Sequence, residues 1–192
     1  NVLAADARAH GDSEGTKIGM GWPERFDVIK WIKLIISWEP NAQIILHGVS
    51  MGAATVLMAS GEELPENVKV IIADCGYTSE WDEFKCEANA LHIPWFPVLN
   101  AASVMSRLRD GYDFKQASAL EKVKQSRIPT LFIHGSDDEL VPYSMLDKLY
   151  SAAACEKECL TVNGAGHALS SSVEPELYWN TVESFIEKYS EK

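Results

Sequence analysis

Short runs of aliphatic and β-branched residues alternate with longer helix-like runs along the chain, and this alternation constrains the fold most strongly. The strand-like runs are Asn1–Asp6 (NVLAAD), Gln43–Gly48 (QIILHG), Val68–Asp74 (VKVIIAD), Ile128–Gly135 (IPTLFIHG) and Glu158–Val162 (ECLTV). The run VKVIIAD lacks a regular alternation of polar and apolar residues, which is typical of a parallel strand covered on both faces. The pattern therefore predicts an α/β fold with a mainly parallel sheet and helices on both faces.

The runs between the strands carry helix signals. They cover residues 22–40, 52–60, 143–153 and 174–192. Residues 78–127 break the alternation with a stretch of mixed helical and loop signals between two strands. An insertion of this length between core strands is typical of a lid over a site. We therefore expect one domain over residues 1–192, with a helical cap inserted at residues 78–127.

Composition narrows the classes of partner. The chain has 17 basic and 28 acidic residues and a net charge of −11. Such an acidic surface argues against nucleic acid and anionic membranes as main partners. No apolar run reaches the length of about 18 residues that a transmembrane helix needs, and no signal-peptide pattern is visible. The four cysteines match no metal-binding spacing, so we expect free thiols, a reducing compartment and a cytoplasmic location. A membrane anchor or signal in a missing N-terminal segment is the alternative.

A serine between two glycines, Gly48-Val49-Ser50-Met51-Gly52, lies where a strand-like run gives way to a helical run. A useful nucleophilic serine needs exposure on a sharp turn, a nearby base, and hydrogen-bond donors for the oxyanion. The G-x-S-x-G pattern supplies the turn, and the N–H of Met51 at the helix start can face the oxyanion. A structural glycine turn is the alternative, but the flanking strand and helix favour Ser50 as a nucleophile.

Five histidines are candidates for the base that activates this serine. His167 is the best placed, because it follows the last strand in the small-residue loop NGAGHALS. His134 ends a strand and is expected to fill the end of the sheet, whereas His47 lies within a strand and is expected to be a hydrogen-bonded core residue. His10 belongs to the glycine-rich first loop, and His92 belongs to the insertion.

The acid is expected after a strand between Ser50 and His167 in the chain. The loop HGSDDELVP offers Asp137, Asp138 and Glu139. Its carboxylate must accept a hydrogen bond from one imidazole nitrogen and stabilise the imidazolium. Spacing alone does not choose between adjacent aspartates.

With these motifs the chain resembles the α/β-hydrolase superfamily, and most of all its bacterial esterase-like serine hydrolases. AADARAHGDSEG resembles the D-x-R-x-x-G-x-S loop, HGVSMGA the nucleophile elbow, FIHGSDDELVP the G-x-x-D-x-x-V-P acid loop, GAGHA the histidine loop and YWNTVESFI the closing helix. Aligned from Gly135, the acid-loop pattern selects Asp138 as the acid, with Val141 and Pro142 in place, and leaves Asp137 as the alternative.

The resemblance implies a hydrolase of small carboxylic esters that works through an acyl-enzyme on Ser50, with no cofactor and no metal. A peptidase or thioesterase with the same triad and a non-catalytic binding module are the alternatives. An amide substrate would need an acidic residue near the lid to hold its N-terminus: Glu80, Asp82 or Glu83. Four residues of the insertion either line an acyl pocket or pack the insertion onto the core: Trp81, Trp95, Phe96 and Leu99.

In this superfamily three strands precede the one that NVLAAD resembles, and one of them leads into the loop with the second oxyanion donor. We therefore expect the full gene product to be longer, and the sheet to have a gap or a rearranged edge between NVLAAD and QIILHG. Met51 is the one oxyanion donor expected here, and loss of one donor costs about 10²–10³ in rate. The chain alone is expected to be inactive or to be completed by another segment.

Overall fold

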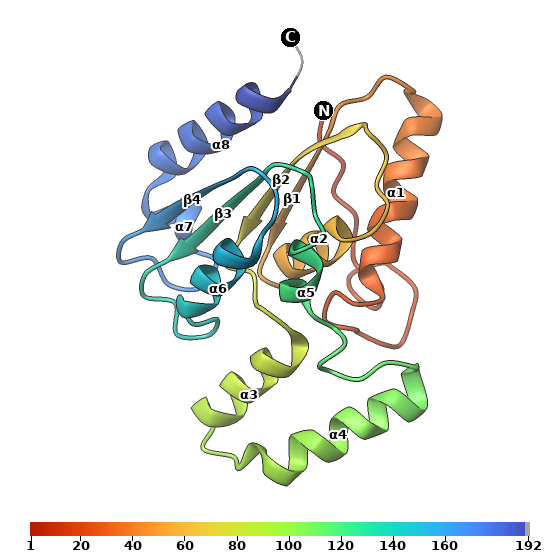
Figure 1. Ribbon diagram of the computed structural model, residues 1–192, viewed down its shortest axis with the longest axis vertical. Coiled ribbons are helices and arrows are strands. Elements are labelled where there is room, and N and C mark those ends of the chain that lie inside the picture. Colours follow the sequence, from red (N-terminus) through yellow and green to blue (C-terminus); the bar gives the residue numbers. More distant parts are fainter. Residues whose placement is uncertain (191–192) are drawn as a thin grey trace.

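The computed structural model describes residues 1–190 and has a four-stranded parallel sheet at its centre (Figure 1). The strands lie in the order β1 (Ile44–Val49), β2 (Val68–Asp74), β3 (Thr130–Gly135) and β4 (Lys157–Val162), and all neighbours are parallel. The helices are α1 (Glu24–Trp38), α2 (Met51–Ser60), α3 (Glu80–Ala90), α4 (Trp95–Asp110), α5 (Ala119–Val123), α6 (Ser144–Ala152), α7 (Ser170–Val173) and α8 (Pro175–Tyr189). The prediction of an α/β fold with a parallel sheet is confirmed.

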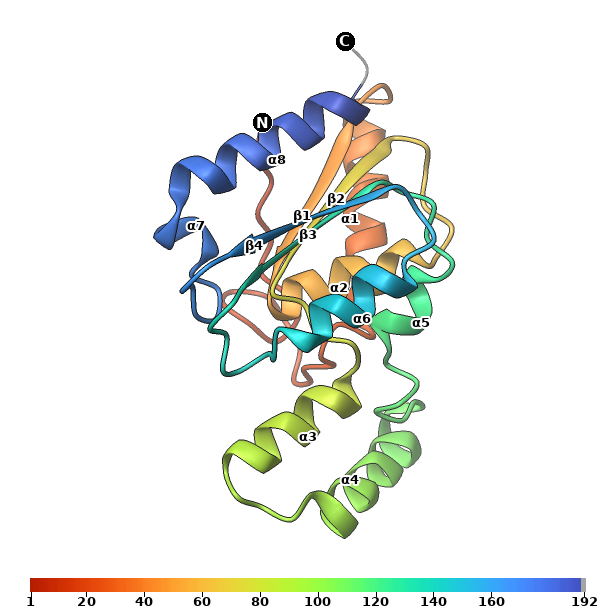
Figure 2. The same ribbon diagram turned by 60° about the vertical axis from the view of Figure 1, so that its left-hand side comes forward.

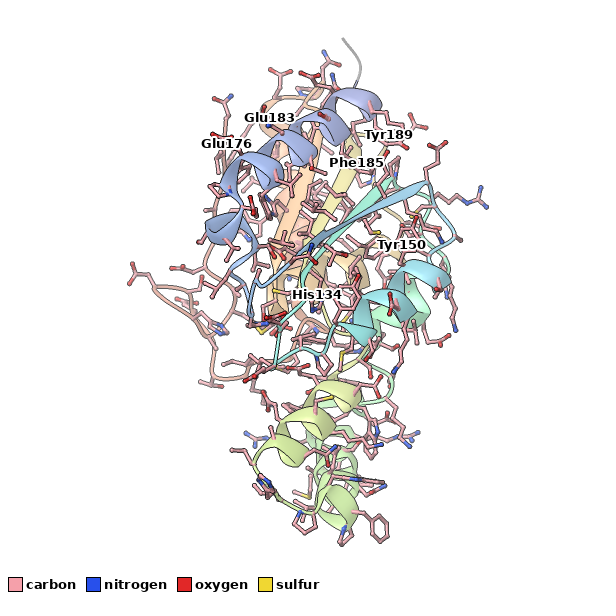
Figure 3. All side chains as sticks on the ribbon, turned by 90° about the vertical axis from the view of Figure 1, so that its left-hand side faces the viewer. His134, Tyr150, Glu176, Glu183, Phe185 and Tyr189 are labelled. Atoms are coloured by element: carbon pink, nitrogen blue, oxygen red, sulfur yellow. The ribbon has the colours of Figure 1, made fainter. Side chains whose placement is uncertain are left out.

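Helices cover both faces of the sheet. Successive residues of a strand point to opposite sides, so each buried strand presents apolar side chains to both layers of helices. On β2, Ile71 packs into a core formed with α1, α2, α5 and α6, whereas Ile72 packs into a second core formed with α8. Figure 2 shows α8 on the side of the sheet opposite α2, α5 and α6, with the short α7 next to its N-terminal end. In Figure 3, Phe185 of α8 turns toward the sheet, and Glu183 turns away from it.

The strand predicted over Asn1–Asp6 is wrong. These residues form no regular secondary structure, and Val2 is 95% exposed. A strand needs a neighbour to accept and donate its backbone hydrogen bonds, and among residues 1–190 the edge strand β1 pairs with β2 alone. Asp6 instead organises the following loop, where its carboxylate accepts the N–H of Asp12 at 3.0 Å.

The segment between β2 and β3 divides into a projecting part and a core part. Helices α3 and α4 extend away from the sheet (Figures 1 and 2), whereas α5 packs in the core through the buried Ala119 and Val123. An isolated antiparallel bridge between Ser79 and Ser118 ties the two ends of the projection together. The role of residues 78–127 as a cap stays a prediction. Within residues 1–190, no helix combines the length and the hydropathy that crossing a bilayer requires.

Candidate active site

Ser50 lies on the sharp turn between β1 and α2. Its φ of 55° and ψ of −118° form a conformation that residues with a side chain rarely adopt. The N–H of Ser50 donates to the carbonyl of Asp74 at 2.8 Å, which holds the turn against the end of β2. The turn that the sequence predicts between a strand and a helix is therefore present.

Gly48 allows the start of α2 to pack directly against β1. A Cβ at this position would lie 2.3 Å from the carbonyl carbon and oxygen of Gly52, a separation that real Cβ atoms do not tolerate. Gly52 is different, because a Cβ there would meet no heavy atom within 4 Å. The two glycines of the motif thus have unequal structural importance.

The Gly48→Ala substitution is expected to displace the start of α2 together with Ser50. We expect a loss of about 1–3 kcal/mol in the free energy of unfolding and a fall of about 10²-fold in kcat/KM. The matched control is Gly52→Ala, which has room and gains about 0.5–1 kcal/mol from the helix propensity of alanine. Denaturant unfolding measures the first effect and steady-state hydrolysis of a soluble ester the second. Wild-type values for Gly48→Ala would contradict this account of the turn.

Three side chains from separate loops meet at this turn. His167 Nε2 lies 2.7 Å from Ser50 Oγ, and His167 Nδ1 lies 2.9 Å from Asp138 Oδ2. Because an ionised carboxylate only accepts hydrogen bonds, Nδ1 carries the proton and Nε2 offers its lone pair to the serine hydroxyl. The structure thus brings together the three residues that the sequence selects.

The carboxylate of Asp138 is fully enclosed by hydrogen-bond donors. Its side chain has no exposed area, and Oδ1 accepts the N–H groups of Leu140 at 3.0 Å and Val141 at 2.9 Å. Burial by itself would raise the pKa of Asp138, but hydrogen bonds from His134, His167 and Val141 outweigh it and hold the pKa below its ordinary value. An acid that stays ionised at neutral pH can stabilise an imidazolium.

The other candidate acids and bases lie apart from this cluster. Asp137 is exposed and accepts the hydroxyl of the preceding serine at 2.6 Å, and Glu139 is exposed as well. His10 and His92 lie in loops, as expected. The expectation that His47 is a core residue is wrong in part. It is hydrogen-bonded, with Nε2 2.9 Å from a tyrosine hydroxyl of α8, but it lies exposed on the edge strand.

His134 makes a contact that the sequence did not indicate. It fills the end of β3, as expected, and is 1% exposed (Figure 3). Its Nε2 lies 2.9 Å from the Val141 carbonyl oxygen and 3.3 Å from Asp138 Oδ2. Both atoms are acceptors, so Nε2 carries the proton and supports the acid loop. A histidine at a strand end gives the same sequence signal whether it fills space or positions an acid.

Backbone strain gathers around the same cluster. Cys75 (φ 46°) and Ala168 (φ 58°) join Ser50 among the six non-glycine residues with positive φ within residues 1–190.

Cys75, Asp138 and His167 also offer possible metal-ligand atoms within 4.8 Å of one another. Burial, however, raises the pKa of Cys75 to about 12, and the other two side chains are hydrogen-bonded to each other. We therefore assign no metal ligand.

Met51 is the first residue of α2. The N–H groups of a first helical turn have no acceptor within the helix, so this one is free to face an oxyanion at Ser50. Its role as an oxyanion donor, and the position of a second donor, stay predictions.

The four apolar residues predicted to line an acyl pocket lie in different surroundings. Trp95 contacts Trp81 and Phe96 edge to face, with ring centroids 6.4 Å and 6.2 Å apart. Leu99 is 7% exposed, whereas Phe96 is 65% exposed on the outside of the projection. Their part in substrate binding stays a prediction.

Sequence comparison places the chain among hydrolases. A family model described as the prolyl oligopeptidase family matches residues 23–192. The Bacillus subtilis protein YqkD is 30% identical over 193 residues, with 100% of this chain and 63% of YqkD covered. The lysophosphatidylserine lipase ABHD12 of Macaca fascicularis is 29% identical over 155 residues, with 80% of this chain and 38% of the lipase covered. The chain thus spans less than two thirds of the length of these relatives.

Solved structures share the fold. The esterase Pf2001 of Pyrococcus furiosus matches with a TM-score of 0.74 at 22% identity. The match covers 96% of this chain and 69% of the esterase chain. The acylaminoacyl peptidase of Pyrococcus horikoshii has a TM-score of 0.68 at 16% identity, covering 88% of this chain and 28% of its own. The parallel sheet with helices on both faces is therefore part of an α/β-hydrolase fold. Because the family model matches most of its length, the chain belongs to the prolyl oligopeptidase family of hydrolases.

Proposed function

We propose that this chain carries the catalytic centre of a serine hydrolase that cleaves carboxylic esters through an acyl-enzyme on Ser50. The observation that carries the proposal is the pair of hydrogen bonds that His167 makes, to Ser50 at 2.7 Å and to Asp138 at 2.9 Å. An esterase among the fold neighbours and a lipase among the sequence relatives support an ester as the substrate.

The mechanism is acyl transfer in two steps. His167 Nε2 takes the proton of Ser50 while Oγ attacks the ester carbonyl, and the resulting oxyanion faces the N–H of Met51. Asp138 stabilises the imidazolium, which then gives its proton to the leaving alcohol. Water, deprotonated by His167, next cleaves the acyl-serine and regenerates the enzyme. His134 acts indirectly, by holding the carboxylate of Asp138 in place.

A peptidase is the second candidate, supported by the family and by the acylaminoacyl peptidase among the fold neighbours. A lid carboxylate would then hold the peptide ammonium. Glu80 and Glu83 are each 3% exposed, and Asp82 already accepts the hydroxyl of Thr78 at 2.6 Å. The enclosure of Glu80 and Glu83 disfavours direct contact with a free peptide N-terminus, and so disfavours an aminopeptidase.

The test is a matched set of substrates given to the whole protein: a nitrophenyl ester, a nitroanilide and a thioester with the same short acyl group. We expect fluorophosphonate labelling and ester cleavage, with much slower cleavage of the anilide. Faster cleavage of the thioester than of the ester would indicate a thioesterase. Efficient cleavage of the anilide would indicate a peptidase, because the anilide has the poorer leaving group. An absence of labelling and of all three activities would contradict the proposed function.

A further inference from the structure

The outer side of the projection exposes apolar side chains to the solvent. Within residues 1–190, seven of the twenty large apolar side chains that are exposed fall in the short stretch from residue 91 to residue 108. We call them the apolar outer patch: Leu91, Ile93, Phe96, Val98, Val104, Met105 and Leu108. A helix at a protein surface normally turns its polar side to the solvent, so the patch indicates a partner.

The patch follows one side of α4. Val98, Met105 and Leu108 are separated by seven and three residues, a spacing that brings side chains onto the same side of a helix. Their exposed fractions are 58%, 61% and 79%. Leu99 and Ser103, each 7% exposed, occupy the inward side. Because α4 lies at the far end of the projection from the sheet (Figures 1 and 2), its outward side is free to meet a broad surface.

The charge of this stretch departs from that of the chain. The net charge of the chain is −11, yet residues 88–109 contain no acidic residue and include Arg107 and Arg109. Both arginines are exposed near the C-terminal end of α4, and Trp95 and Phe96 stand at its N-terminal end. An apolar side with aromatic and basic neighbours is typical of helices that lie in a lipid–water interface.

An apolar groove continues the patch between α3 and α4. Its volume is about 240 Å³. Leu91, Ile93 and Val98 line the groove and belong to the patch as well, together with Phe84 and Trp95 deeper between the helices. An apolar surface that leads into an apolar groove suits a lipid, because one acyl chain can enter the groove while its neighbours contact the patch.

We propose that the apolar outer patch docks onto the surface of a zwitterionic phospholipid membrane. The apolar side chains enter the boundary between headgroups and acyl chains, and Arg109 reaches a lipid phosphate. Arg107 lies 3.8 Å from Asp113 and exchanges this exposed ion pair for a lipid phosphate on docking. A zwitterionic surface fits better than an anionic one, because an anionic surface would repel a chain with a net charge of −11. The proposal does not depend on which bond the enzyme cleaves.

The test is flotation of the whole protein with phosphatidylcholine vesicles. We expect wild type to float, and the double variant Met105→Glu/Leu108→Glu to partition at least about tenfold more weakly, because two apolar side chains are lost from the interface. The matched control is Leu177→Glu, a 45% exposed leucine on α8, which is expected to float like wild type. Hydrolysis of a water-soluble short-chain ester is expected to stay unchanged in both variants, which separates docking from catalysis.

Three results would overturn the proposal. The first is wild-type protein that stays with the aqueous phase. The second is a double variant that floats as well as wild type, or a Leu177→Glu variant that loses binding equally. The third is a dimer that the double variant dissociates in the absence of any vesicle binding, which would assign the apolar outer patch to a second copy of the chain.

Discussion

Replacing Ser50 by alanine is expected to abolish fluorophosphonate labelling and to lower kcat for a soluble ester by about 10⁴-fold or more. Ser50 Oγ is the atom proposed to bond to the acyl group, and alanine lacks it while fitting the same turn. KM is expected to change little, because the hydroxyl contributes mainly to the transition state. Single-turnover and steady-state kinetics measure both terms, and labelling that survives in Ser50→Ala would exclude this serine as the nucleophile.

Asp137 and Asp138 are adjacent, so a matched pair of substitutions tests which of them is the acid of the site. Asp138→Asn keeps the shape of the acid but removes the charge that stabilises the imidazolium of His167, so we expect kcat to fall by about 10⁴-fold. Asp137→Asn, one residue away and exposed, is expected to keep wild-type activity. A double variant lacking both Ser50 and His167 is expected to be no worse than Ser50→Ala, since the residues act as a unit. Equal losses in the two asparagine variants would refute the assignment of Asp138.

Replacing both Glu80 and Glu83 by glutamine is expected to raise the free energy of unfolding above pH 7 and to flatten its decline with pH. Each side chain is 3% exposed and has one carboxyl oxygen without a hydrogen-bond partner among the described residues. Burial, and then nearby carboxylates, raise the pKa of each from 4.5 to about 8. Ionising either group inside the protein is therefore unfavourable.

The sign follows from proton binding. Between pH 4.5 and 8 each carboxyl keeps its proton in the folded protein and releases it in the unfolded chain. Its stabilising contribution is therefore complete below pH 4.5 and is lost as the pH rises through 8. The loss for each carboxyl between pH 6 and 8 is at most about 2.7 kcal/mol.

Urea unfolding at pH 6, 7, 8 and 9 measures the free energy of unfolding of the Glu80→Gln/Glu83→Gln variant against wild type. The matched control is Glu183→Gln on the outward side of α8, where the side chain is exposed (Figure 3) and no change with pH is expected. A double variant that loses stability with rising pH as steeply as wild type would show that these carboxyls are ionised in the folded protein.

Alternation of strand and helix signals was enough to predict the four strands of the sheet and helices α1, α2, α6 and α8. The meeting of Ser50 and His167 with an acid from the loop after β3 followed as well, because the carboxyl ends of parallel strands lie at one edge of a sheet. The choice of Asp138 over Asp137 came from the resemblance of its loop to the G-x-x-D-x-x-V-P pattern. Ser50, Asp138 and His167 each follow a different strand in sequence, so the fold itself brings them together. The local sequence motifs and the order of the strands therefore predicted the same place for the site.

Other features could not be predicted, because they depend on neighbours that a local pattern does not contain. NVLAAD has the composition of a strand, but it forms none without a neighbouring strand. The enclosure of Glu80 and Glu83 depends on how the projection joins the core. Likewise, the spacing of apolar residues on α4 defines a side of the helix without saying whether protein or solvent lies next to it.

Positive φ angles at Ser50, Cys75 and Ala168 also bear on how this enzyme can be engineered. Each strained residue costs of order 1–3 kcal/mol, so relief of strain at these places is an easy route to higher thermal stability. Selection for heat resistance alone would therefore tend to relax the backbone at Ser50 and next to His167. We therefore expect directed evolution of this chain to need screening for turnover and stability together, because strain at a site is often lost when stability is gained.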